Sequence, residues 1–105
     1  MTYRKKYYSK GLYVTKHNTP YAISGNERII FEVRLTPESD SYIIQKLLTP
    51  SDYDTNKNYY KLTLSDTDTD ITPHHYYYGV ALRDTNNILH PVAEGRFIVL
   101  PSSVR

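Results

Sequence analysis

The stretch that decides the fold class is RIIFEVRL, at residues 28–35. Apolar and charged side chains alternate along it, and a period of two is typical of a β-strand with one buried and one solvated face. The apolar face of this predicted strand carries Ile29, Phe31, Val33 and Leu35. The opposite face carries Arg28, Glu32 and Arg34.

Two further stretches, residues 59–64 and 76–83, repeat this alternation and are rich in side chains that pack well on a pleated sheet. Inward positions are predicted at Tyr60, Leu62, Leu64, Tyr76, Tyr78, Val80 and Leu82. Weaker strand patterns are found at residues 12–15, 21–24, 42–48, 88–92 and 96–100. No window has a helical period, and the best helical candidate is a single turn at residues 49–53.

Turn-forming residues separate these strands where an antiparallel chain has to reverse, at residues 25–26, 36–40 and 84–87. Pro91 and Gly95 interrupt the last run, which is typical of an edge strand with a bulge. One domain of short antiparallel strands predicts an all-β fold, an immunoglobulin-like antiparallel β-sandwich of about seven strands. A small barrel is the main alternative.

The 105 residues have the length of one domain. We expect a basic, tyrosine-rich N-terminal arm at residues 1–10, the sandwich at residues 11–101 and a C-terminal tail at residues 102–105. The side chains expected to meet between the two layers are Phe31, Tyr60, Tyr78 and Phe97.

A polar loop leads into the strand that starts near Tyr76. In sandwiches of this type, a tyrosine at the start of the sixth strand often bonds through its hydroxyl to the backbone a few residues upstream. That bond fixes the corner between the sheets, and we expect Tyr76 to make it. The alternative is an ordinary core tyrosine with a solvated hydroxyl.

The composition excludes several kinds of chemistry. The chain has no cysteine, which excludes disulfides, thiolate zinc sites and cysteine nucleophiles. Asp66, Asp68 and Asp70 alternate as at the start of a calcium loop, but Ile71 and Tyr77 replace the required glycine and glutamate. A turn whose Asp and Thr side chains bond the local backbone is the better interpretation.

The four histidines form no ligand pattern. His74 and His75 are adjacent, so on an extended backbone they point to opposite faces, and His17 and His90 have no partner at ligand spacing. There is no nucleophile elbow, and four glycines are too few for phosphate-binding loops. We therefore expect no catalytic residue, no cofactor and no metal, and predict that the protein is not an enzyme.

Tyrosine dominates the aromatic residues, with 12 Tyr, two Phe and no Trp. Its apolar ring and polar hydroxyl suit surfaces that bind other proteins. The predicted interface residues are Lys6, Tyr7 and Tyr8 in the arm and Tyr59 and Tyr77 on an outer sheet face. We expect exposed strand edges and tyrosine-rich surfaces to bury against neighbours, with the arm reaching an adjacent subunit of a homo-oligomer.

Two other binding functions stay open. The arm interleaves bases with aromatic side chains, as surfaces for single-stranded nucleic acid do, although a net charge of +2 argues against a dedicated duplex-binding protein. Exposed tyrosines such as Tyr53, Tyr59 and Tyr77 could instead bind carbohydrate. No apolar run approaches the ~20 residues of a membrane span, and no apolar core of a signal peptide follows the basic start, so we expect no membrane contact.

The order of motifs in the second half resembles the N-terminal domain of the phage baseplate upper protein family and similar small immunoglobulin-like modules of phage tails and prophages. The corresponding stretches are LTLS at 62–65, DT at 68–69, PH at 73–74, YYYGV at 76–80, DTNN at 84–87 and EGRFIV at 94–99. His74 stands where that family has glycine, and Gly79 where it has aspartate.

This resemblance implies a non-enzymatic virion protein of tail or baseplate type. Such a protein is made in the bacterial cytoplasm, has no signal peptide and assembles with other phage structural proteins. Its motifs are structural, so the resemblance supplies no catalytic or ligand-binding residue.

Overall fold

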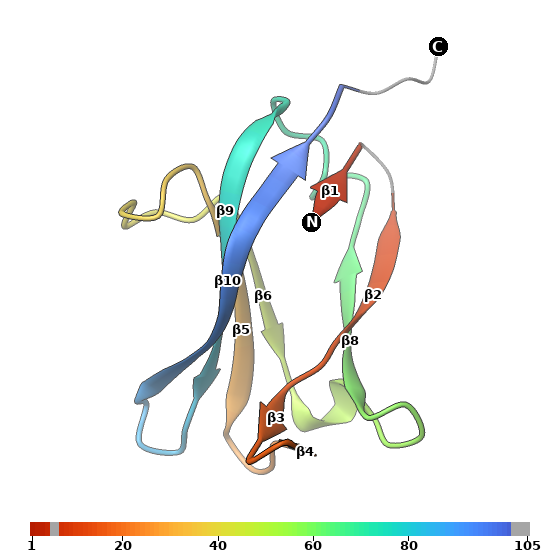
Figure 1. Ribbon diagram of the computed structural model, residues 1–105, viewed down its shortest axis with the longest axis vertical. Helices are drawn as coiled ribbons and strands as arrows, with labels where there is room; N and C mark the ends of the chain where they lie inside the picture. Colours follow the sequence, from red (N-terminus) through yellow and green to blue (C-terminus); the bar gives the residue numbers. More distant parts are fainter. Residues whose placement is uncertain (5–6, 102–105) are drawn as a thin grey trace.

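The computed structural model describes residues 1–4 and 7–101, and it is built of β-strands (Figure 1). One sheet contains β1 (Thr2–Tyr3), β5 (Arg28–Arg34), β6 (Ile44–Leu48), β9 (His74–Arg83) and β10 (Leu89–Val99). A second sheet contains β2 (Tyr8–Leu12), β7 (Tyr53–Asp54) and β8 (Tyr59–Leu64). A small hairpin contains β3 (Thr15–Lys16) and β4 (Thr19–Pro20). The predicted all-β class is confirmed.

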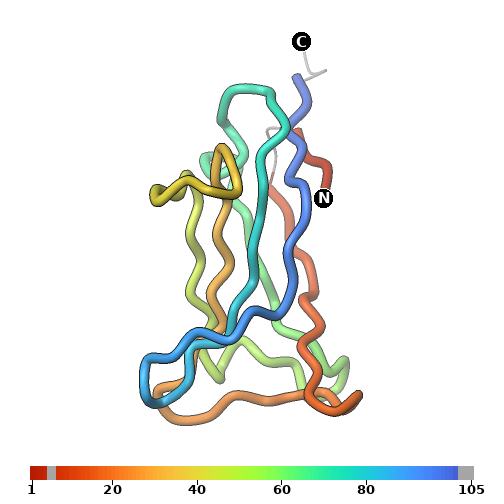
Figure 2. Tube along the Cα trace, turned by 60° about the vertical axis from the view of Figure 1, so that its left-hand side comes forward, coloured from red at the N-terminus to blue at the C-terminus, as the bar shows by residue number. Residues whose placement is uncertain are grey.

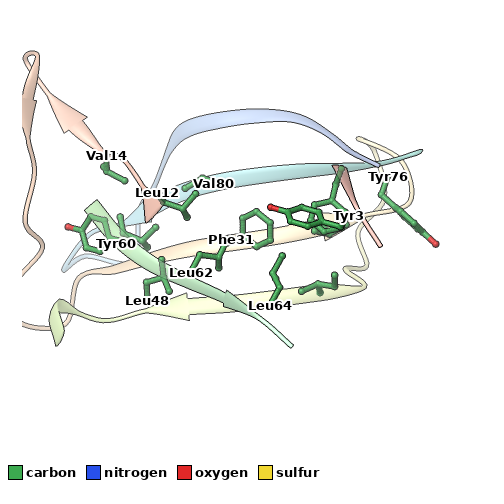
Figure 3. Packing of buried hydrophobic residues seen from close by; sticks show 14 of the residues in the cluster. Tyr3, Leu12, Val14, Phe31, Leu48, Tyr60, Leu62, Leu64, Tyr76 and Val80 are labelled. Atoms are coloured by element: carbon green, nitrogen blue, oxygen red, sulfur yellow. The ribbon is translucent and has the colours of Figure 1, made fainter. Parts of the chain in front are cut away.

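The strand order is β1-β10-β9-β5-β6 in the five-stranded sheet and β2-β8-β7 in the three-stranded sheet. All pairs are antiparallel except β1 with β10. The two sheets face each other across one core, as the layers of a β-sandwich do (Figures 1 and 3).

The core follows the alternation predicted from the sequence. All three inward positions of β8, Tyr60, Leu62 and Leu64, are buried. Leu35 is the exception on β5, because the strand ends at Arg34 and leaves this side chain half exposed. Among the four aromatic residues expected to meet, Phe31, Tyr60 and Phe97 are fully buried, while Tyr78 is partly buried against them.

A chain of aromatic rings crosses the core from one sheet to the other. Tyr8 of β2 contacts Tyr3 edge-on, with 4.5 Å between ring centroids. Tyr3 stacks on Phe97 at 4.8 Å, and Phe97 lies 6.2 Å from Phe31. Phe31 in turn stacks on Tyr78 of β9 at 5.9 Å. These contacts link strands that are far apart in the sequence.

The prediction of a separate N-terminal arm at residues 1–10 is wrong for the residues described. Thr2 and Tyr3 form β1, which pairs with the end of β10, and Tyr3 is buried. Residues 8–12 form β2, an integral strand of the second sheet. The apolar ring of Tyr3 explains the difference, because it packs between Tyr8 and Phe97. The predicted tail at 102–105 lies outside the described residues.

The predicted strand at residues 21–24 is not formed, and a tyrosine hydroxyl explains why. The Tyr60 hydroxyl donates to the carbonyl of Tyr21 at 2.5 Å and accepts from the backbone N–H of Ile23 at 2.8 Å. These backbone groups bond a side chain instead of a neighbouring strand. The segment that leads into β5 is thereby fixed at one end of the core.

Tyr76 fixes the opposite end of the core (Figure 3). Its hydroxyl donates to the carbonyl of Thr72 at 2.6 Å, four residues upstream, which confirms the predicted corner bond. The predicted runs at 88–92 and 96–100 merge into one strand, β10, whose register against β9 shifts between Pro91 and Ala93. The predicted bulge is therefore confirmed.

The Asp/Thr stretch after β8 is a turn closed by its own side chains, as predicted. Asp68 accepts from the backbone N–H of Ser65 at 2.8 Å, and the Ser65 hydroxyl accepts from the backbone N–H of Asp68 at 3.1 Å. The Lys46 ammonium of β6 lies 2.7 Å from the Asp68 carboxylate and so ties the turn to the other sheet. The predicted helical turn is also present, as 3-10 helix η1 (Pro50–Asp52).

We predict that Tyr60→Phe destabilises the protein more than Tyr76→Phe. Without the Tyr60 hydroxyl, the buried N–H of Ile23 loses its partner, which costs about 2 kcal/mol. Without the Tyr76 hydroxyl, the carbonyl of the exposed Thr72 can bond water, and the cost is about 1 kcal/mol. Urea denaturation of the three proteins measures the difference. Equal losses would contradict the role given to Tyr60.

Acid unfolding should depend on Asp68. Burial raises the pKa of its carboxyl, but Lys46 and the two Ser65 bonds outweigh that effect and hold the pKa below its ordinary value. A carboxyl with a lowered folded-state pKa stabilises the fold above its unfolded pKa, and this contribution is lost as pH falls through the folded pKa. We predict that Asp68→Asn is less stable at pH 7 but loses less stability between about pH 5 and pH 2.

The control for this prediction is Asp66→Asn, which changes an exposed carboxyl in the same turn. Denaturation curves at several pH values provide the measurement. If the free energy of unfolding falls by the same amount in wild type and Asp68→Asn over this range, the contact between Asp68 and Lys46 does not stabilise the fold.

Candidate functional site

Three neighbouring rows of side chains run across the strands in the middle of the outer face of the five-stranded sheet, beside a row that contains Leu89, Arg83 and Arg28. The strand register aligns the first row as Pro91, Ala81, Ile30 and Leu47, which are all apolar. It aligns the second as Glu94, Gly79, Glu32 and Gln45. In the third row it aligns Arg96, Tyr77 and Arg34. Each row is separated from the next by two residues along a strand, except on β10, where the bulge separates Pro91 from Glu94 by three.

A groove of about 720 Å³ lies on this face, over residues of all three rows. Gly79 lies at its centre, between Glu32 and Glu94 in the register, and a Cβ atom added there would meet no atom within 4 Å. The absence of a side chain at this position therefore creates the hollow. Tyr77, two residues away on the same strand, is half-buried and lines the groove.

Two loops extend beyond this face at diagonally opposite corners. Residues 35–43 connect β5 to β6, and residues 84–88 connect β9 to β10 at the other end of the sheet. Figures 1 and 2 show both loops on the side that faces away from β2 and β8. Pro37 and Leu89 bring these two corners into the lining of the groove.

Exposed apolar side chains gather on this face and its two corners. Six of the nine large ones exposed among the described residues are Leu35, Tyr42, Ile43, Leu47, Ile88 and Leu89. In contrast, the outer face of the three-stranded sheet carries polar residues such as Ser9, Lys61 and Thr63. The sandwich therefore has one outer face with apolar and charged rows and one that is mainly polar.

Within the second and third rows, the charges are balanced. Arg34 and Arg96 are matched by Glu32 and Glu94. Glu32 bonds Arg34 at 2.8 Å and the Gln45 side chain at 2.7 Å, and Arg34 also donates to the carbonyl of Ser39. The face thus offers both signs of charge in separate rows.

Three sheet edges, at β10, β6 and β2, carry features that disfavour pairing with another strand. Pro91 and the adjacent bulge interrupt the part of β10 that β1 does not cover. On the other edge of the same sheet, β6 places Lys46 in an inward register position, opposite Phe31. On β2, Lys10 pairs with the buried Leu62 and is exposed. These devices leave the open face, rather than the edges, as the surface for a partner.

The five predicted interface residues do not form one site. Tyr77 lies in the groove, as predicted for an outer sheet face. Tyr59 lies on the outer face of the other sheet, where its ring covers Gly11 and contacts Tyr13 edge-on at 5.5 Å. Tyr7 is exposed, whereas Tyr8 packs on Tyr3, and its hydroxyl accepts from the backbone N–H of Arg4 at 2.9 Å. Lys6 lies outside the described residues.

A second groove, of about 580 Å³, lies between residues 13–16 and the uncovered part of β10. It contains two bonded pairs. The Tyr21 hydroxyl donates to the Glu27 carboxylate at 2.8 Å, and this bond raises the pKa of Tyr21. The His90 Nε2 lies 2.8 Å from Asp84, and this contact lowers the pKa of the Asp84 carboxyl, which also accepts from two turn N–H groups. Glu27 and Asp84 thus both stabilise local turns.

Within the part of the chain that the structure describes, no three metal-ligating side chains converge and no helix has the length and apolarity to span a membrane. Comparison of the chain with protein-family models, curated proteins and solved structures finds no match.

Sequence reasoning found Tyr77 but not the rest of the face. Ile30 and Leu47 lie at outward positions, and their apolar character there was the available signal. Gly79 could have been noticed as a glycine inside a strand pattern, which often marks the close approach of another molecule. The alignment of Glu94 with Glu32 needed the register of β10, which the bulge shifts.

We predict opposite effects for substitutions at two glycines of the same sheet. Gly79→Val should raise the free energy of unfolding by about 0.5–1 kcal/mol, because a glycine inside a strand is unfavourable and the added atoms point into open space. Gly95→Ala should lower it by about 1 kcal/mol or more, because the new Cβ would lie 2.8 Å from the ring of Tyr78. Urea denaturation measures both. A loss of stability in Gly79→Val would show that the hollow is filled.

Proposed function

We propose that the protein is a non-enzymatic assembly module of the phage tail or baseplate type, with an immunoglobulin-like fold. The observation that carries the proposal is the uncovered outer face of the five-stranded sheet beside protected edges. A sheet face with exposed apolar side chains and a polar surround is typical of a surface that binds another protein.

The strand order supports the immunoglobulin-like part of the proposal. With β2, β5, β6, β7, β8, β9 and β10 taken as strands B, C, C′, D, E, F and G, one sheet reads G-F-C-C′ and the other B-E-D, which is the variable-type arrangement. Tyr76 then stands at the start of strand F and makes the corner bond of that fold. Tyr78, two residues later, takes the place of the second disulfide cysteine and stacks on Phe31 of strand C.

Support for the virion role comes from the resemblance of residues 62–99 to the phage baseplate upper protein family. The structural motifs of that resemblance fall on β8, the Asp/Thr turn, β9, its hairpin and β10. Of these elements, β9 and β10 supply two of the four strands of the face, so the resemblance covers part of the candidate docking surface.

Nucleic acid fits this face less well than protein. Single-stranded nucleic acid needs a continuous positive path along its phosphates. Glu32 and Glu94 interrupt such a path next to Arg34 and Arg96. We predict that a labelled 20-mer of single-stranded DNA shows no anisotropy change at low salt with up to about 100 µM protein, a concentration that would reveal typical non-specific binding. Binding that weakens steeply with salt would support the nucleic-acid alternative instead.

The virion role is tested on particles. The strain that carries the gene is induced, its particles are purified by density gradient, and the proteins are identified by mass spectrometry. We expect this protein in the particle fraction at a fixed ratio to the other structural proteins. Its absence from particles that contain a complete tail would overturn the proposed function.

A further inference from the structure

We propose that the outer face of β5, β6, β9 and β10 binds a second copy of this chain, face to face and with the strands of the two copies antiparallel. This inference rests on the proposed function as an assembly module and identifies the partner at the same face. It comes from the pattern of charge and shape on the face, which is complementary to itself under one two-fold rotation.

The relevant two-fold axis runs across the strands, between the row of Gly79 and the row of Tyr77. Rotation about such an axis exchanges the two rows, because neighbouring outward positions on a strand are about 6.8 Å apart and the axis lies midway. Each strand then faces the same strand of the other copy. On β9, Tyr77 of one copy faces Gly79 of the other, so that a large ring projects toward the hollow left by the glycine.

The charges agree with this arrangement. On β10, Glu94 of each copy faces Arg96 of the other, and on β5, Glu32 faces Arg34. In the dimer, each of these four acidic side chains therefore faces a basic side chain of the other copy. An axis parallel to the strands would keep each row at its own level, where it would meet the like-charged row of the other copy. Charge thus selects the antiparallel orientation.

The shape agrees as well. The 35–43 loop stands at the β5–β6 side of one end, and the β9–β10 hairpin stands at the opposite corner (Figures 1 and 2). After the rotation, the two protrusions of the second copy lie at the two corners that the first copy leaves empty. The exposed apolar residues of its loop, such as Tyr42 and Ile43, then lie toward the apolar row that contains Ile30 and Leu47.

The size of the face sets the expected strength. Four strands about 4.8 Å apart, over about seven residues of 3.4 Å each, cover a plane of ~450 Å² per copy before the loops are added. Standard interfaces bury about 800 Å² per partner, so this one lies at the lower end. We expect a reversible dimer that forms in the micromolar range and weakens with salt.

The test is sedimentation equilibrium of the full chain from about 5 µM to 1 mM, with Gly79→Val, Glu94→Arg, Arg96→Glu and the double variant Glu94→Arg/Arg96→Glu. We expect wild type to approach twice its 12.3 kDa mass as concentration rises. Each single variant should weaken the dimer at least tenfold. The double variant should recover wild-type association. It reverses the charges at both positions, and since position 94 of one copy faces position 96 of the other, opposite charges again meet across the interface.

Lys61→Glu is the matched control, since it reverses a charge on the outer face of the other sheet and should leave association unchanged. Gly79→Val separates binding from folding, because it should stabilise the monomer while it blocks the hollow. A wild type that stays monomeric to 1 mM, or a double variant no better than the single ones, overturns the inference. Incorporation into particles in either case leaves the proposed function standing, with a different protein on this face.

Discussion

The contact on which the rest of the structure depends is the run of rings from Tyr8 through Tyr3, Phe97 and Phe31 to Tyr78. It joins the three-stranded sheet to the middle of the five-stranded sheet without a disulfide. Aromatic pairs at these distances add about 0.5–1.5 kcal/mol each beyond the area they bury. Because the first and last strands of the sandwich supply two of the rings, the ends of the chain are tied to its centre.

This core also determines which surfaces are free. Side chains on the inner face of β5 and β9 are committed to the core, so the outer positions of the same strands are arranged by register into rows. The bulge in β10 shifts the alternation by one residue and brings Pro91 and Glu94 to the same outer face. Packing inside the sandwich thus determines the sequence of apolar, acidic and basic rows on the outer face of the five-stranded sheet.

The strong alternation of β5, β8 and β9, the hairpin turn at residues 84–87 and the corner bond of Tyr76 could all be predicted, because each follows from local pattern and turn chemistry. The buried place of Tyr3 could not, since it depends on a parallel pairing with Val99 at the other end of the chain. The segment 21–24 has a strand pattern, but the Tyr60 hydroxyl bonds the carbonyl of Tyr21 and the N–H of Ile23 in place of a neighbouring strand. Of the candidate site, Tyr77 was predictable, whereas its alignment with Arg34 and Arg96 required the pairing of three strands.

The central claim is that the outer face of the five-stranded sheet binds a second copy of this chain. Amide chemical shifts of the ¹⁵N-labelled chain, followed by NMR as its concentration is raised, test it most directly. The account predicts concentration-dependent shifts at Ile30, Tyr77, Gly79 and Glu94, with little change at Ser9, Lys61 and Thr63. Shifts confined to the three-stranded sheet, or spectra that do not change at all, would contradict it.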